Sequence, residues 1–213
     1  MDRYKKYQAI ASICVTVFIL SLALCITALD RKVYGYSARK YIQLGTLSTF
    51  EAELVYDQIA DDFCSFFKKG YDVAGYELGE SNIKALNELK VFYRWAWILA
   101  VLSFAGMIVS FVILSKRRYY MPFVYGGVGA MLVSACGACI IFASSGGILS
   151  EIKAMILHMD YSLFAEGDVI YGLFPPEYAR YVGLAYLMTV IMLMVLMILI
   201  RFLIVYCGRP HKF

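Results

Sequence analysis

The chain has 213 residues, of which 62% are hydrophobic and only 17% are charged. A soluble domain of this length has no use for so much apolar surface, so the composition excludes an ordinary globular protein and indicates an integral membrane protein. The formal net charge of +4 comes without a basic patch interleaved with aromatic residues, so we expect no nucleic-acid partner.

Four apolar runs meet the requirement of about 20 residues for a membrane-spanning helix. They cover residues 7–29, 92–114, 121–143 and 181–205. The first run is longer than the apolar core of about 7–15 residues in a cleavable signal peptide, and no cleavage site follows it, so we interpret it as a helix. The sequence therefore predicts an all-α membrane protein, a single membrane domain over residues 1–213 with four transmembrane helices.

Three short basic segments predict the orientation of these helices. They lie at residues 3–6, 116–118 and 209–212, at the ends of the apolar runs. The positive-inside rule assigns such segments to the cytoplasm. Both termini are then cytoplasmic, and the loops 30–91 and 144–180 form an extracytoplasmic cap.

The six cysteines argue against disulfide and thiol redox chemistry. Only Cys64 lies in a predicted outer loop, so no disulfide forms within the exterior part, and the paired-cysteine signatures of claudin-like and tetraspanin-like proteins are missing. Cys136 and Cys139 form a C-x-x-C motif inside the third span. A thiol oxidoreductase needs a second, exterior pair, so we interpret these two as small residues at helix-packing positions.

The first outer loop contains a helix signal. Ser48 and Glu51 form a capping box, which predicts a helix over residues 49–69. Its apolar and acidic residues fall on opposite faces. The apolar face holds Val55, Ile59, Phe63 and Phe66, and the other face holds Asp57, Asp61 and Asp62. The preceding segment 30–47 has a poor pattern, and we interpret it as extended.

A second helix of this loop is predicted to begin near Ser81 and to continue without a break into the second span. Glu88, Lys90 and Arg94 enter the membrane boundary on it. Because Lys90 and Arg94 are one turn apart, we expect two cations on one side of the helix at headgroup height. For Arg94 alone, reaching toward lipid phosphates is the simpler explanation.

The third and fourth spans differ in their packing pattern. Small residues recur at every fourth position of the third span, which predicts close contact with a neighbouring helix and a central place in the bundle. These residues are Gly126, Ala130, Ser134 and Ala138. The fourth span is rich in methionine and is predicted to be mostly lipid-facing, with Arg201 reaching the inner surface. Its methionines are Met188, Met192, Met194 and Met197.

The loop between these spans gathers titratable groups beside the membrane. His158 is the only histidine outside the extreme C-terminus, and a predicted short helix over 148–159 puts it on the same side as Glu151. Asp168 and Glu177 follow before the fourth span. Titratable groups at a membrane boundary indicate a functional site. An amphipathic connector with its polar side in water is the alternative.

Three segments taken in order resemble a known family. They are NELKVF at 87–92, MILHM at 155–159 and DVIYGLFPPEY at 168–178. Together with four spans in a chain of this length, they are similar to the bacterial family of small integral membrane proteins that includes the lipoprotein intramolecular transacylase. The resemblance implies a multi-pass protein of the bacterial plasma membrane. It also implies transfer of an acyl chain from the lipid-modified N-terminal cysteine of a lipoprotein to that cysteine's α-amino group, at the outer leaflet.

The resemblance also implies site residues and partners. The implied catalytic residues are His158, Glu88 and Lys90, and the implied substrate-binding residues are Arg94, Glu151, Asp168 and Glu177. The expected partners are membrane lipid or a lipoprotein, and a partner membrane protein. No cofactor and no metal ion are expected.

This sequence departs from the family at one position. The family has a histidine about one turn before its E-x-K motif, and Ala85 stands there in this chain. Two interpretations follow. Either His158 acts as the base without a second histidine, or the protein is a non-catalytic membrane scaffold or accessory subunit that binds lipid or a partner membrane protein.

Overall fold

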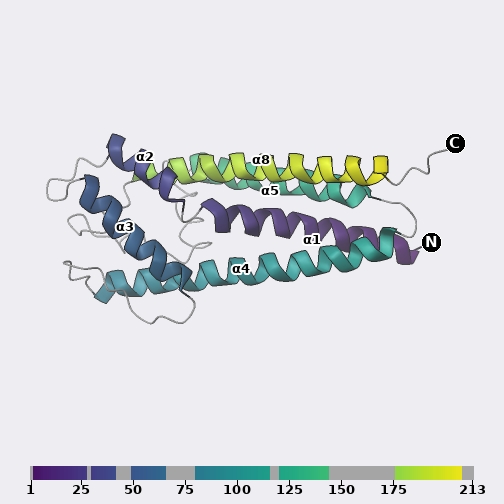
Figure 1. Cartoon of the computed structure of the whole chain (residues 1–213), viewed down its shortest axis with the longest axis horizontal. Coiled ribbons are helices and arrows are strands. Elements are labelled where there is room, and N and C mark those ends of the chain that lie inside the picture. The colour runs from purple at the N-terminus through teal and green to yellow at the C-terminus, as the bar shows by residue number, and fades with distance from the viewer. Residues whose placement is uncertain are drawn as a thin grey trace. The chain divides into compact units, whose positions relative to one another are not determined.

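The computed structural model describes residues 2–27, 30–41, 49–65, 80–115, 120–143 and 176–207. All of the regular secondary structure in these ranges is helical, which confirms the predicted all-α class (Figure 1). The helices are α1 (Asp2–Thr27), α2 (Arg31–Tyr41), α3 (Thr49–Cys64), α4 (Glu80–Ser115), α5 (Met121–Ala143) and α8 (Pro176–Cys207). A helix pairs its own backbone groups, which a chain in lipid requires.

The four predicted spans coincide with four of these helices. Three stretches are long and apolar enough to cross a membrane: Lys5–Thr27 in α1, Leu86–Leu114 in α4 and Tyr181–Tyr206 in α8. Within α5, Met121–Gly137 is a shorter apolar helix. The cytoplasmic orientation of the termini and the extracytoplasmic position of the two loops stay predictions.

Helix α4 is one continuous helix of 36 residues. It begins at Glu80, one residue before the predicted start, and carries Glu88, Lys90 and Arg94 into the second span without interruption. The predicted continuity of the loop helix and the span is therefore confirmed.

The chain divides into two compact units. The first comprises Met1–Ile26, Ala96–Ala138 and Tyr186–Phe213, and it contains most of α1, α5 and α8 with the second half of α4. The second comprises Thr27–Trp95 and Cys139–Ala185, and it contains α2 and α3 with the first parts of α4 and α8.

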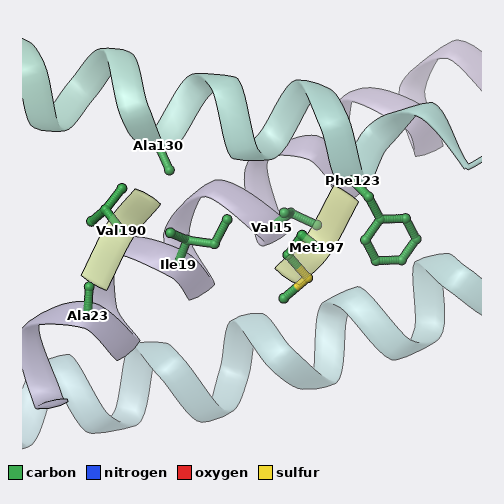
Figure 2. Packing of buried hydrophobic residues seen from close by; sticks show 7 residues of the cluster. All are labelled: Val15, Ile19, Ala23, Phe123, Ala130, Val190 and Met197. Carbon is green, nitrogen blue, oxygen red and sulfur yellow. The ribbon is translucent and has the colours of Figure 1, made fainter. Parts of the chain in front are cut away.

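The core of the first unit is formed by α1, α5 and α8 (Figure 2). Helix α1 contributes a residue every fourth position, which is the spacing of one helix face. The buried residues are Val15, Ile19 and Ala23 of α1, Phe123 and Ala130 of α5, and Val190 and Met197 of α8.

The small residues of α5 permit a close approach to α1, as predicted. A Cβ atom added at Gly126 would lie 2.5 Å from Cβ of Val15 and 2.8 Å from the carbonyl oxygen of Ser12. Ala130 and Ser134 are buried. The side chain of Ala138 lies outside the described residues. For Gly126, Ala130 and Ser134 the predicted packing role is confirmed.

The prediction for the fourth span holds for only part of its methionines. Met188 and Met192 are exposed on the surface of α8, as a lipid-facing side chain is. Met197 is buried in the core, and Met194 contacts α5, because a Cβ atom at Gly127 would lie 2.9 Å from its Cγ. Glycine on α5 leaves the space that the long methionine side chain fills.

Two expectations about the first loop are wrong. Residues 31–41 form the helix α2 rather than an extended segment. This helix is rich in charged residues, and in its described part Tyr34 is the one buried side chain. Helix α3 ends at Cys64 rather than continuing to Lys69.

Asp62 corrects the predicted faces of α3. Val55, Ile59 and Phe63 are buried, as predicted, but Asp62 is also buried, with 3% of its surface exposed. Ala52, Tyr56 and Ala60 are buried as well, and the seven buried residues of α3 fall within an arc of about 160° around the helix axis. Asp62 lies only about 20° from Val55 around this axis, so it belongs to the buried face and its assignment to the acidic face was wrong.

Candidate functional site

The first part of α4 has a buried stripe with a lysine in its middle. Leu86, Lys90 and Tyr93 recur at intervals of four and three residues, and all three are buried. Lys90 is 4% exposed. Lysine is almost never buried to this extent unless its charge is compensated, so this position places a cationic donor inside the second unit.

The end of α3 packs beside this stripe. The ring of Phe63 contacts the ring of Tyr93 edge-on, with centroids 6.3 Å apart. Edge-to-face aromatic pairs of this kind hold two helices in a defined register. Lys90 therefore lies one turn before the point where α3 and α4 meet.

Glu88 lies on the other side of α4 from Lys90. Residues two apart differ by about 200° around a helix axis, so they do not share a face. Glu88 is exposed and lines an open groove of about 480 Å³. Its other described lining residues are Ile83, Lys84, Asn87 and Val91, all from α4.

Arg94 follows Lys90 by one turn and lies on the same side of α4, as the sequence predicted. It is half-buried, whereas Trp95 and Trp97 beside it are exposed. Exposed tryptophans mark the boundary between lipid hydrocarbon and headgroups. The two cations therefore lie near this boundary, with Lys90 the more enclosed of the two.

An ion-pair bridge joins α2 to α3. The guanidinium of Arg31 contacts both Asp57, with Nε 3.3 Å from Oδ1, and Asp61, to which its terminal nitrogen donates a hydrogen bond. The two acids are one turn apart on α3, and this spacing is the signal by which the sequence could have indicated a shared cation. All three side chains are well exposed, so the bridge adds little stability.

A tyrosine stack lies between the same two helices. The rings of Tyr34 and Tyr56 are parallel within 5°, with centroids 3.8 Å apart. Burial is the main cause that raises the pKa of Tyr34 above its ordinary value, and Tyr56 and the carboxylate of Glu53 add to it. The hydroxyl of Tyr34 is thus kept in its neutral form. Sequence reasoning missed this pair, because it interpreted the segment around Tyr34 as extended.

The remaining predicted site residues lie outside the described residues. This holds for His158, Glu151 and Asp168. Glu177 belongs to the first turn of α8, and Ala85 to α4, but their side chains are also outside the description. Of the seven predicted site residues, the structure therefore locates the side chains of Glu88, Lys90 and Arg94, and it brings Lys90 and Arg94 to one side of α4.

The described donors suit binding of anionic or carbonyl oxygen. Within the described ranges, no three His, Cys, Asp or Glu side chains gather in a way that would hold a metal ion. Lys90 and Arg94 are nitrogen donors that carry charge, and such groups stabilise negative charge on oxygen.

Comparison with known proteins gives the fold but no relative in sequence. No family model matches the chain, and no curated protein does. Solved structures of the membrane integral lipoprotein intramolecular transacylase Lit from Bacillus cereus do match. One, of a histidine-to-arginine variant, has a TM-score of 0.85 at 14% identity and covers 97% of this chain and 94% of that chain.

Two further structures of the same transacylase agree with this result. A histidine-to-alanine variant matches with a TM-score of 0.84 at 13% identity, over 97% of this chain and 96% of that chain. Another structure of the protein matches with a TM-score of 0.78 at 13% identity, over 97% and 98%. The chain therefore shares the fold of this membrane protein over almost its whole length, as the resemblance predicted, at a sequence identity that shows the fold alone.

Proposed function

We propose that this protein acts on the lipid-modified N-terminus of a lipoprotein, moving an acyl chain from the diacylglyceryl group to the α-amine of the N-terminal cysteine. The observation that carries the proposal is the burial of Lys90 in the first part of α4, in a chain that shares the fold of an enzyme of this kind. A lysine enclosed between Leu86 and Tyr93 keeps its amine donor away from bulk water. A donor in such a position suits stabilisation of negative charge on a substrate oxygen.

The reaction makes one C–N bond and breaks one C–O bond. The α-amine loses a proton to a base and attacks the ester carbonyl carbon, giving a tetrahedral intermediate with a negatively charged oxygen. This intermediate collapses, the acyl group stays on nitrogen, and the released glyceryl oxygen takes up the proton. Because donor and acceptor belong to one molecule, no second substrate has to be held in place.

Lys90 would stabilise the negative oxygen of the intermediate. A cationic donor away from water stabilises a developing oxyanion far more than an exposed one does, because the local dielectric constant is low. Arg94, one turn further along the same side, would bind the ester oxygens of the remaining glyceryl chain. His158 is proposed as the base, since an amine with an ordinary pKa near 8 needs only a single base to free it.

Glu88 would have a different part from Lys90. It faces the open groove, on the opposite side of α4, and is exposed. Because it does not share a face with Lys90, we propose that this carboxylate attracts the α-ammonium of the approaching lipoprotein and does not contact it during the transfer. Glu151, Asp168 and Glu177 stay proposed as further substrate-binding acids.

The test is mass spectrometry of lipoprotein N-termini in a bacterial host that lacks its own transacylase. Expression of the wild type is expected to produce the lyso form with an N-acyl chain. Lys90→Met keeps the volume and removes the charge, and loss of an oxyanion donor is expected to slow the reaction about 10²–10³-fold. His158→Ala is expected to abolish the product.

Lys32→Met is the matched control, because Lys32 is an exposed lysine of the same unit that the site does not use. It should give as much lyso product as the wild type. The amount of folded protein in detergent is measured for each variant. Full activity of both Lys90→Met and His158→Ala, with folded protein in each case, would refute the site.

A second candidate function follows from Ala85. Without the family's histidine one turn before the E-x-K motif, the protein would bind a lipoprotein or another membrane protein without turnover, as a scaffold or accessory subunit. In that case the wild type gives no lyso product, although it is recovered in complex with a lipid-modified substrate. Appearance of product in Ala85→His but not in the wild type would favour this function.

A further inference from the structure

Arg201 lies on the face of α8 that packs into the bundle. At about 100° per residue, it falls within about 20° of Val190 and about 40° of Met197 around the helix axis. Both of those residues are buried in the core of the first unit. Arg201 therefore continues the buried stripe of α8 by one turn toward the C-terminal end, and does not project straight into lipid.

The guanidinium of Arg201 has a buried and unsatisfied donor. Its Nε is buried, and no acceptor among the described residues lies within hydrogen-bond distance of it. Its Cζ is 5.5 Å from the ring centroid of Phe202, which is exposed. A ring face attracts a cation, but it leaves the N–H without an acceptor. An arginine that simply extended into water would have an exposed Nε.

The unit to which Arg201 belongs has almost no acid to pair with it. Its three segments contain nine Lys and Arg residues but a single carboxylate side chain, Asp2. The chain as a whole carries 20 Lys and Arg against 16 Asp and Glu, so the shortage of acid belongs to this unit. Among the described residues no carboxylate pairs with this guanidinium, and a charge near lipid needs an anion as partner.

The surroundings of Arg201 are suited to binding a phospholipid headgroup. Within the first unit, the start of α1, the end of α4, the start of α5 and the end of α8 meet at one end (Figure 1). Lys5 of α1 is exposed there. Tyr120 and Ile200 pack against the core cluster that contains Phe123 and Met197, so an apolar and aromatic surface lies next to the arginine.

We propose that this end of the bundle binds the phosphodiester group of an anionic membrane phospholipid, with Nε and a terminal nitrogen of Arg201 as paired donors. The planar fork of arginine binds two phosphate oxygens at once, which a lysine cannot do. The excess of basic residues in the unit favours a headgroup with net negative charge over a zwitterionic one. The site is separate from the proposed acyl-transfer site, and neither depends on the other.

The experiment measures lipid binding of the full-length protein by native mass spectrometry, and its melting temperature, with three probes. These are phosphatidylglycerol, phosphatidylcholine and inorganic phosphate, each added to detergent-purified protein. Phosphatidylglycerol is expected to stay bound and to raise the melting temperature more than the other two. Arg201→Gln is expected to weaken phosphatidylglycerol binding about tenfold or more, as loss of a charge-assisted hydrogen-bond donor does.

Lys6→Gln is the matched control, since it removes the same charge from the same unit at an exposed position. Lys6 lies about 180° around α1 from the buried Val15, so it should keep phosphatidylglycerol binding near the wild-type level. Arg201→Lys retains the charge but removes the fork, and an intermediate affinity is expected from it.

Three results would overturn the proposal. They are equal binding of phosphatidylglycerol and phosphatidylcholine, binding of inorganic phosphate alone, and wild-type phosphatidylglycerol affinity in Arg201→Lys. If Arg201→Gln does not fold, Arg201→Lys still tests the proposal, because it keeps the positive charge. Acyl transfer, assayed in parallel, is expected to be unchanged in vesicles of phosphatidylcholine alone, which separates the two sites.

Discussion

The hydroxyl of Thr16 on α1 donates a hydrogen bond to the carbonyl oxygen of Gly126 on α5, over 2.9 Å. The same hydroxyl lies 3.0 Å from the carbonyl oxygen of Ser12, so its single proton is shared between its own helix and the neighbouring one. A carbonyl of α5 is reachable only because Gly126 has no side chain. A hydrogen bond and a small-residue contact therefore act together at one crossing.

Replacing Thr16 with valine is expected to weaken this crossing slightly. Valine keeps the shape of threonine but donates no hydrogen bond, and an interhelical hydrogen bond in a membrane protein contributes about 0.6 kcal/mol on average. The measurement is the melting temperature in detergent. Ser21→Ala is the control, since the hydroxyl of Ser21 bonds only within α1 in the described structure. A larger loss in Ser21→Ala than in Thr16→Val would contradict the assigned role.

Overpacking at Ala130 is expected to lower the stability of the protein much more than Thr16→Val does. Ala130 is fully buried between helices, and extra methylene groups in a packed core cost about 1–3 kcal/mol. We expect Ala130→Leu to lower the melting temperature clearly. Met192→Leu is the control, because Met192 is 72% exposed on α8. Equal losses of melting temperature in Ala130→Leu and Met192→Leu would contradict the central position of α5 in the bundle.

Alkaline pH is expected to destabilise the second unit through Tyr34. Its pKa is raised in the folded protein, so the neutral phenol is favoured there and the full stability is present below the unfolded pKa of about 10. As the pH rises above that value, the unfolded state loses a proton first and stability falls.

Tyr34→Phe removes this titration, and its melting temperature is expected to fall less steeply above about pH 10. Tyr36→Phe serves as the control, because Tyr36 is an exposed tyrosine on the same helix. Identical slopes for Tyr34→Phe and the wild type would show that this tyrosine does not link folding to pH.

Cys64 tests the predicted orientation. It is exposed at the end of α3, and the basic segments predict that this loop is extracytoplasmic. A membrane-impermeant thiol reagent applied to intact cells is expected to label it, and Cys64→Ser should lose the label. If only a membrane-permeant reagent labels Cys64 in folded protein, the predicted orientation is wrong.

The sequence by itself determined the class of the protein and the positions of its membrane helices. Apolar runs of about 20 residues have few stable alternatives in lipid, where each backbone group must be paired within its own helix. The small residues Gly126, Ala130 and Ser134 also predicted a helix contact correctly. The order of three short segments pointed to the fold that the solved structures share.

Only the tertiary structure decided which side of each helix is covered, and by what. Helix α2 was missed because its sequence is mostly polar, and in its described part only the side chain of Tyr34 is buried. Lys90 and Glu88 are two residues apart in one motif, but one is buried and the other faces the groove. Burial of Asp62 and of Nε of Arg201 likewise depends on neighbours far away in the chain. Composition and spacing describe one helix at a time, whereas the cost of a buried charge is set by everything packed around it.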